Sequence, residues 1–201
     1  VQEAAGPRGR DGAVTEPRAA TGRSGTGRSG TGAGDALRIV RAEPLTPAAF
    51  APFGVVLEAA GPGRAVNGGT ARRVDYPAPL VSTRPEARLR VARYTCTAAE
   101  GAIVVAVLER HAASSQWFLP VEPARYVVVV APGDDAPRVD EARAFVAEAP
   151  TGIAYARGTW HAPLRVVGSD AALLCLVHED GSAADCEEVT LGAAAFAVAI
   201  P

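Results

Sequence analysis

The segment IVVAVLERHAASSQWFLP, residues 103–120, contains two short apolar runs separated by small and polar residues. The runs Ile103–Glu109 and Gln116–Leu119 are rich in β-branched and aromatic residues and have the length of strands. The residues between them are typical of a loop between strands. The segment therefore predicts two neighbouring β-strands, with charged and polar groups where the first ends and the second begins.

The polar groups of this segment fall on defined faces of the two predicted strands. Side chains alternate across a strand, so Glu109 and His111 point to one face and Arg110 to the other. Gln116 and Phe118 share a face of the second strand. If that face lines the interior of a barrel, Glu109, His111 and Gln116 converge.

The same pattern of short Val-rich runs, separated by Gly, Pro and Asp clusters, extends over most of the chain. Two brief helices interrupt it. One follows Thr46 as N-cap, with Pro47 in the first helical position and Gly54 ending it. The other runs from Arg138 to Val146, where apolar residues recur at helical spacing. The remaining predicted strands are Leu37–Val40, Val55–Glu58, Leu89–Cys96, Arg125–Ala131, Gly152–Tyr155, Leu164–Val167, Ala171–Val177 and Ala193–Ile200.

Many short strands with two brief helices argue against a doubly wound α/β fold and favour a sandwich or a jelly-roll β-barrel. The sequence contains no G-x-G-x-x-G after a strand, no Walker loop and no G-x-S-x-G elbow. The fold class is therefore all-β.

The first 34 residues differ in composition from the rest. They are rich in Gly, Arg, Ser and Thr, and the pentapeptide TGRSG occurs twice in succession at 21–30. Such a segment buries too little apolar area to offset the entropy of ordering. We therefore expect residues 1–34 to be a disordered tail and residues 35–201 to form a single catalytic domain.

Charge and cysteine content exclude several classes of protein. The formal net charge is −2, so the chain has no excess of basic residues for binding nucleic acid. It has no Lys, so a substrate carboxylate would have to be bound ionically by Arg. Three cysteines without C-x-x-C spacing fit a reducing compartment. No apolar run reaches about 18 residues, so no membrane span is expected, and no signal peptide is visible. These features together predict a cytoplasmic protein.

The second distinctive histidine lies in the block Gly158–Leu164, which reads GTWHAPL. The spacing E-x-H-x4-Q followed downstream by G-x-x-H resembles the metal motif of cupins, H-x-H-x3-4-E and later G-x-x-H. In this comparison Glu109 stands for the first His and Gln116 for the Glu, with His111 and His161 as the remaining ligands. The alternative interpretation is an exposed Glu109–Arg110 pair and two structural histidines.

The likeness extends beyond these residues. The blocks that carry it occur in the same order in ureidoglycolate lyase, which the sequence resembles from about Leu37 to Val189. They are Phe50-Ala51-Pro52-Phe53-Gly54, Asn67-Gly68-Gly69, Leu108–His111, Ser115-Gln116-x-Phe118-x-Pro120, Gly152-x-x-Tyr155, Trp160-His161-x-Pro163-Leu164 and Asp185-Cys186-Glu187.

The resemblance implies a cupin-like β-barrel that is usually a homodimer. It also implies cleavage of (S)-ureidoglycolate to glyoxylate and urea, late in allantoin breakdown, and for some members a divalent metal such as nickel. A mixed site of carboxylate, imidazole and amide would accept Ni²⁺, Mn²⁺ or Fe²⁺.

The expected roles follow from the reaction. Breaking the C–N bond needs a base for the hydroxyl proton and an acid for the leaving nitrogen, and His suits either role. His111 and His161 are assigned to these roles in open order, and Glu109 would orient its neighbour, stabilise charge or bind metal.

The predicted substrate-binding set surrounds this pair. Gln116 would bind the urea amide or the metal, and Ser115 and Tyr155 lie in the matching blocks. The loop at Asn67 and Gly68 offers backbone N–H groups for the carboxylate, with Arg73 as the nearest cation. The resembling proteins often carry other residues at Gly68, Thr95, Ala154, Ala156 and Ala162, which bears on metal and carboxylate binding.

Two further functions remain as alternatives on the same fold. One is another metal-dependent cupin enzyme, such as an isomerase or dioxygenase, and the other is a cupin that binds a small acid without catalysis. An oxygenase site prefers two His and one carboxylate, and Glu109 at the first ligand position with Gln116 at the third argues against such a site. No DNA-binding helix pair is visible, which argues against a regulator.

Overall fold

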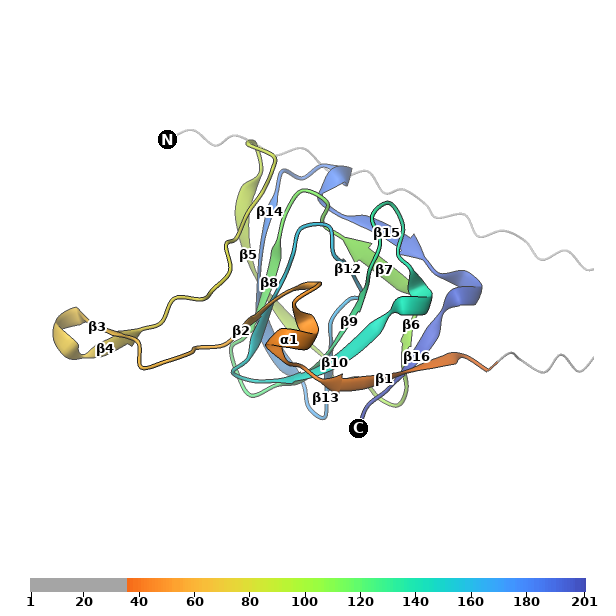
Figure 1. Ribbon diagram of the computed structural model, residues 1–201, viewed down its shortest axis with the longest axis horizontal. Helices are drawn as coiled ribbons and strands as arrows, with labels where there is room; N and C mark the ends of the chain where they lie inside the picture. The colour runs from red at the N-terminus through yellow and green to blue at the C-terminus, as the bar shows by residue number, and fades with distance from the viewer. Residues whose placement is uncertain (1–35) are drawn as a thin grey trace, which may run out of the picture. The chain divides into compact units, whose positions relative to one another are not determined.

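Strands dominate residues 36–201, the part of the chain that the computed structural model describes (Figure 1). The predicted tail, residues 1–34, lies outside the described residues. One sheet has nine strands, with β13 (Arg165–Val167) paired to β9 beside the main path. The order of that path is β15 (Glu187–Thr190), β7 (Val107–Arg110), β12 (Trp160–His161), β9 (Arg125–Ala131), β10 (Arg143–Glu148), β1 (Arg38–Pro44), β16 (Phe196–Ala199) and β6 (Ile103–Val105).

A second sheet of five strands faces the first, and the two curl toward each other (Figure 1). Its order is β2 (Gly54–Leu57), β11 (Gly152–Tyr155), β8 (Gln116–Pro120), β14 (Ala171–Glu179) and β5 (Arg88–Cys96). Together the sheets make the cupin-like β-barrel that the sequence predicts.

Strand β9 is buried on both faces, which explains its unbroken run of valines. Tyr126 and Val128 pack into the core between the sheets, whereas Val127 and Val129 pack into a second core beneath β1, β6 and β16. Alternation thus divides one strand between two apolar clusters. Because β9 also pairs with β10, β12 and β13, it fixes the positions of the strands that carry the polar groups described below.

The first predicted helix is confirmed, although it is short. Helix α1 spans Pro47–Phe50, and the Thr46 side chain accepts a hydrogen bond from the Ala49 N–H at 3.2 Å. Phe50 is fully buried and meets Phe145 edge to face, with 5.7 Å between ring centroids. The helix therefore contributes one aromatic anchor to the core between the sheets.

The second predicted helix, Arg138–Val146, is wrong. Only a 3-10 turn at Val139–Glu141 forms there, and the following residues make strand β10. Ala144 packs into one core while Phe145 and Ala147 pack into the other. A strand buried on both faces has no polar face, so its apolar residues also matched a helical spacing.

The predicted strand Ile103–Glu109 is broken at Ala106. Its first part, β6, pairs with β16, and its second part, β7, pairs with β12 and β15 at the other end of the sheet. The expected strand Ala193–Ile200 shortens to β16 behind a 3-10 turn at Gly192–Ala194. Strands β12 and β15 were not expected, because each is short and lacks an apolar run.

A two-stranded hairpin projects from the barrel (Figure 1). It consists of β3 (Arg64–Val66) and β4 (Ala71–Arg73), joined by a 3-10 turn at Asn67–Gly69. Within the described residues these strands pair only with each other. Asn67 and the next two glycines have positive φ, which the tight turn requires.

Candidate active site

Glu109 and His161 are direct partners in the pairing of β7 with β12, so their side chains share one face. His161 Nε2 lies 3.3 Å from Glu109 Oε1, within ion-pair distance although outside hydrogen-bond geometry. The other ring nitrogen, Nδ1, donates its proton to the Thr159 carbonyl at 2.8 Å. Both nitrogens of this buried ring therefore face oxygen atoms.

His111 follows the last residue of β7 and is held by main-chain groups on two sides. Its Nδ1 donates to the Asp185 carbonyl at 2.7 Å, and its own carbonyl accepts from the Gly158 N–H at 2.9 Å. The ring is 5.8 Å from that of His161, with near-parallel planes. Nε2 is buried and has no hydrogen-bond partner, so its lone pair is available to a ligand.

Tyr155 and Gln116 approach the histidines from the opposite sheet. They are register partners on β11 and β8. The Tyr155 ring stacks on His161 with 4.1 Å between centroids, and its hydroxyl is buried without a partner. The Gln116 amide donates to Cys175 Sγ at 3.6 Å, which leaves its oxygen without a hydrogen bond. Of the four polar residues predicted to converge, Glu109, His111 and His161 form one cluster, and Gln116, from the other sheet, lines a cavity together with Glu109.

A cavity of about 260 Å³ opens beside this cluster. Apart from Glu109 and Gln116 its walls are largely apolar, and no arginine is among the described residues that line it. A polar cluster at the end of an apolar cavity is a usual form of a small-molecule site. The other lining residues are Tyr94, Cys96, Phe118, Pro163, Leu164 and Leu173.

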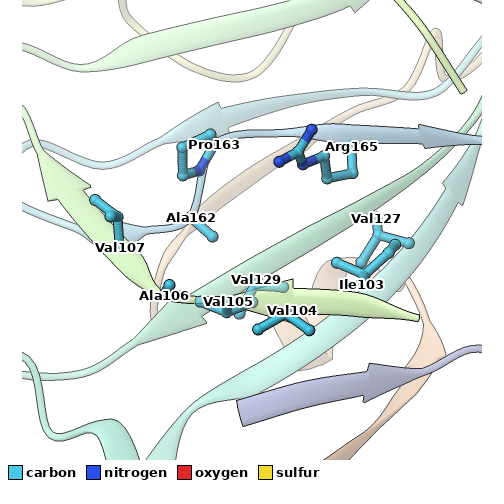
Figure 2. Close-up of a pocket in the computed structure, with 10 residues that line it drawn as sticks. All are labelled: Ile103, Val104, Val105, Ala106, Val107, Val127, Val129, Ala162, Pro163 and Arg165. Carbon is cyan, nitrogen blue, oxygen red and sulfur yellow. The ribbon is translucent and has the colours of Figure 1, made fainter. Parts of the chain in front are cut away.

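A second cavity, of about 180 Å³, lies beside the loop that follows His161 (Figure 2). Valines from β6, β7 and β9 form most of its wall, and Arg165 is the only charged residue among the described residues that line it. Its lining contains no carboxylate, whereas the first cavity is lined by Glu109, which belongs to the histidine cluster. The first cavity is therefore the candidate active site.

Burial and neighbouring charge shift the ionisation of the cluster. The adjacent His161 lowers the pKa of the Glu109 carboxyl despite partial burial, so that carboxyl is ionised. Burial lowers the pKa of His111, and the neighbouring His161 adds to the effect, so His111 is neutral. Burial also raises the pKa of Tyr155 well above its ordinary value. The structure thus gives His111 a lowered pKa that its place in the sequence does not predict.

Cys186 is a neighbour of the site to which the sequence analysis assigned no role. Its Sγ lies 3.9 Å from Glu109 Oε2. Burial, with the nearby Glu109 charge, raises the pKa of this thiol to about 12, so it keeps its proton and donates it to the carboxylate. The residue precedes β15, which pairs with β7. Its place in the Asp185–Glu187 block was the only signal available in the sequence.

Four of the predicted substrate-binding residues are not brought to the cavity. Asn67, Gly68 and Arg73 lie on the projecting hairpin, where Arg73 is exposed and forms an ion pair with Asp75 at 2.5 Å. Ser115 is buried, and its hydroxyl accepts from the Val81 N–H at 2.9 Å. Contact of these four residues with substrate stays a prediction.

The donor set fits a divalent metal. Ligand atoms of Glu109, His111 and His161 lie within 4.8 Å of one another. Each histidine commits Nδ1 to a backbone carbonyl, which turns Nε2 inward in the way that metal-binding histidines are usually oriented. The unpartnered oxygen of Gln116 is a fourth candidate ligand. Imidazole, carboxylate and amide together suit Ni²⁺, Mn²⁺ or Fe²⁺.

Two curled sheets with a cavity beside a cluster of two histidines and a carboxylate define a cupin-like β-barrel with an enzyme-like site. The particular family follows from the sequence. The profile of the ureidoglycolate lyase family matches residues 37–198, and the chain belongs to this family of lyases.

Relatives of known family support this assignment. The ureidoglycolate lyase of Azotobacter vinelandii is 36% identical over 157 residues, covering 78% of this chain and 94% of that protein. The ureidoglycolate lyase of Stutzerimonas stutzeri is 37% identical over 153 residues, covering 76% of this chain and 89% of that protein. The match thus includes nearly the full length of both relatives.

Solved structures with partial likeness include oxalate decarboxylase of Bacillus subtilis and RmlC from Streptococcus suis. The first is 16% identical with a TM-score of 0.36, covering 51% of this chain and 24% of that chain. The second is 10% identical with a TM-score of 0.32, covering 48% and 46%. Within residues 36–201, no helix is long and apolar enough to cross a membrane.

Proposed function

We propose that this protein cleaves (S)-ureidoglycolate to glyoxylate and urea. The observation that carries the proposal is the cluster of Glu109, His111 and His161 in a chain of this family, beside a cavity that Glu109 and Gln116 line. The substrate carbon bears a hydroxyl, a carboxylate and a urea nitrogen. Cleavage removes the hydroxyl proton, forms the C=O bond, breaks the C–N bond and returns a proton to the leaving nitrogen.

His111 is the base in this proposal. Its Nδ1 proton is used by the Asp185 carbonyl, so the neutral ring presents the bare Nε2 lone pair. The lowered pKa of the ring, caused first by burial, keeps it neutral near pH 7. Nε2 takes the hydroxyl proton as the carbonyl of glyoxylate forms. A general base of this kind typically contributes roughly 10²–10⁴-fold to the rate.

His161 is the acid. Its Nδ1 donates to the Thr159 carbonyl and its Nε2 lies 3.3 Å from the Glu109 carboxylate, so Nε2 is the atom placed to carry the proton that the reaction needs. Nε2 delivers one of them to the departing urea nitrogen. Glu109 stabilises the imidazolium beforehand, and Tyr155 fixes the ring plane by stacking. The proposal thus takes His111 as the base and His161 as the acid, an order that the sequence left open.

Gln116 orients the urea group. The amide nitrogen of Gln116 is held by Cys175, so the free oxygen can accept an N–H of the urea end of the substrate. If a divalent metal were held by Glu109, His111, His161 and Gln116, it would take the two Nε2 atoms in place of the proton-transfer roles and would supply Lewis-acid polarisation of a substrate oxygen. The apolar remainder of the cavity excludes water from the reacting carbon.

Release of urea and glyoxylate from (S)-ureidoglycolate, measured in parallel with purified protein, tests the function. We expect equal amounts of both products. Absence of cleavage with Ni²⁺, Mn²⁺ and Fe²⁺ supplied in turn would contradict the proposal and favour a cupin of another specificity. Glyoxylate with ammonia in place of urea would show a different reaction on the same substrate.

The metal has a test of its own. We expect protein purified without a His-tag to bind one Ni²⁺ or Mn²⁺ per chain, and His111→Ala and His161→Ala to lose that binding, because both Nε2 atoms face the same space. His178→Ala is the matched control. Activity lost in EDTA and restored by metal would make the metal catalytic. Full activity in EDTA would show that the proton-transfer pair suffices.

We also propose that the protein acts late in allantoin breakdown, as a cytoplasmic homodimer. The three cysteines of the chain all lie in the described part and are free thiols, which supports a reducing compartment. Strand β5 is the candidate dimer seam. It is an edge strand of nine residues whose Leu89, Val91 and Tyr94 are 47%, 61% and 45% exposed. Long exposed edges of this kind favour pairing with another strand.

A further inference from the structure

The segment Val81–Arg84 pairs with the loop that directly follows His111. The Ser115 N–H donates to the Val81 carbonyl at 3.0 Å, and the Thr83 N–H donates to the Ala113 carbonyl at 2.9 Å. Ser82 forms an isolated β-bridge with Ser114. Residues 81–84 therefore lie along this loop as an additional short strand-like strap.

On its other side the strap holds a second loop through Arg84. The Arg84 guanidinium forms ion pairs with Asp180, at 3.0 Å, and with Asp185, and it donates to the Ser182 hydroxyl at 3.1 Å. The side chains of Arg84 and Asp185 are only 17% and 12% exposed. The Asp185 carboxylate also accepts the Gly181 N–H at 2.6 Å.

The second loop carries the oxygen that orients the proposed base. The Asp185 carbonyl is the acceptor for Nδ1 of His111. The strap thus connects the chain just after His111 with the residue that fixes its ring. Arg84 touches neither the cavity lining nor the histidine, so it acts on both through Asp185.

We infer that Arg84 is a positioning residue for His111. Its ion pair with Asp185 holds the carbonyl that keeps His111 in the tautomer with a bare Nε2. This inference rests on the proposed function, because it takes His111 to be the base. Without the ion pair the 180–186 loop relaxes, the carbonyl moves and the ring loses the acceptor that selects its tautomer. Small displacements of a catalytic group are enough to slow a reaction about 10²-fold.

The test compares Arg84→Ala, Arg84→Lys and Asp185→Asn with Arg138→Ala. Arg138 is the matched control because it forms an exposed ion pair with Glu141 away from the site. For each folded variant we would measure kcat and KM on ureidoglycolate. Nitrogen-15 NMR of the imidazole rings reports the tautomers, and the chain has only three histidines to assign.

We expect Arg84→Ala and Asp185→Asn to lower kcat roughly 10- to 10²-fold with KM within about twofold. The His111 signals should shift from a pure Nδ1–H tautomer to a mixture. Arg84→Lys should recover part of both, since it keeps the charge but not the fork of donors. Arg138→Ala should resemble the unmodified protein. A merely structural Arg84 would lower the melting temperature without changing the tautomer.

Wild-type kcat together with unchanged His111 signals in folded Arg84→Ala would overturn the inference and leave the proposed function intact. If Arg84→Ala does not fold, Asp185→Asn and Arg84→Lys decide by the same two measurements. If the unmodified protein does not cleave ureidoglycolate, the proposed function fails. The ring signals of the variants then still show whether Arg84 positions His111.

Discussion

At the scale of single residues, the two histidines of the site differ through their hydrogen-bond partners. Both use Nδ1 for a backbone carbonyl, but only His161 has a carboxylate beside Nε2. His178, the third histidine, lies near the end of β14 and does not belong to the cluster of Glu109, His111 and His161. The two site histidines can therefore act as base and as acid because their surroundings differ, although they are the same type of residue.

Removal of either site histidine should reduce turnover more than binding. We expect His111→Ala and His161→Ala each to lower kcat at least ~10²-fold, the usual size of general acid–base catalysis. The double variant should be little worse than the worse single one, because the two groups act as a unit. Steady-state kinetics beside a melting curve for each variant provide the measurement.

His178→Ala should be nearly neutral in kcat and serves as the control for loss of a histidine. Normal cleavage by both folded single variants would end the proposed mechanism. A loss of activity in only one of the two variants would support one of the proposed roles, acid or base, and reject the other. Arg110 offers a contrast, since it pairs with Glu187 and stacks on Trp160 on the far side of β7.

At the scale of elements, the approach of β2 to β11 depends on Gly54. A Cβ there would lie 2.0 Å from the Ala154 carbonyl oxygen, and the residue has φ of +154°. Gly54→Ala should therefore push apart the strand pair that ends in Tyr155, the residue stacked on His161. Urea unfolding should show a loss of stability of more than about 1 kcal/mol.

Gly168→Ala is the matched control for this substitution. Gly168 also has positive φ, at +84°, but a Cβ there meets nothing within 4 Å. Its variant should lose only the cost of the strained backbone, about 1 kcal/mol. Equal losses in both variants would show that the close approach to Ala154 is unimportant.

At the scale of the whole molecule, β5 should be where two copies meet. Antiparallel pairing of two β5 strands about Ala92 places Arg90 opposite Tyr94 and Arg93 opposite Val91, so no arginine faces another. Val91→Arg should place an arginine directly opposite Arg93 of the other copy on both sides of the seam and yield monomers, because like charges facing each other destabilise a strand pair, and light scattering at several concentrations measures this. Val104→Arg, also at an exposed valine but on β6, should leave the dimer intact. A monomeric unmodified protein would contradict the proposed homodimer.

The tail gives the second prediction at this scale. Residues 1–34 lie outside the family match, which begins at residue 37, and they carry few large apolar side chains. A protein that begins at Asp35 should keep its melting temperature and its kcat, because such a segment adds no apolar area to a core. A fall of several degrees would show that the tail contributes to stability.

The sequence by itself determined the β-barrel, helix α1 and four polar residues of the site. Local patterns carry this information: alternation along Glu109–His111, the Thr46–Pro47 cap, and turn residues between Val-rich runs. It could not determine β10, because a strand buried on both faces loses the period that distinguishes it from a helix.

Only the tertiary structure decided which groups stand beside which. Register placed His161 opposite Glu109, and the loop before β15 brought Cys186 and the Asp185 carbonyl to the site. It also placed Arg73 on the projecting hairpin, away from the cavity to which sequence order had assigned it. Contacts between residues far apart in the chain depend on strand pairing and loop closure, which no local pattern encodes. Sequence therefore fixes the kinds of group available, whereas strand pairing sets their partners and hence their charge and role.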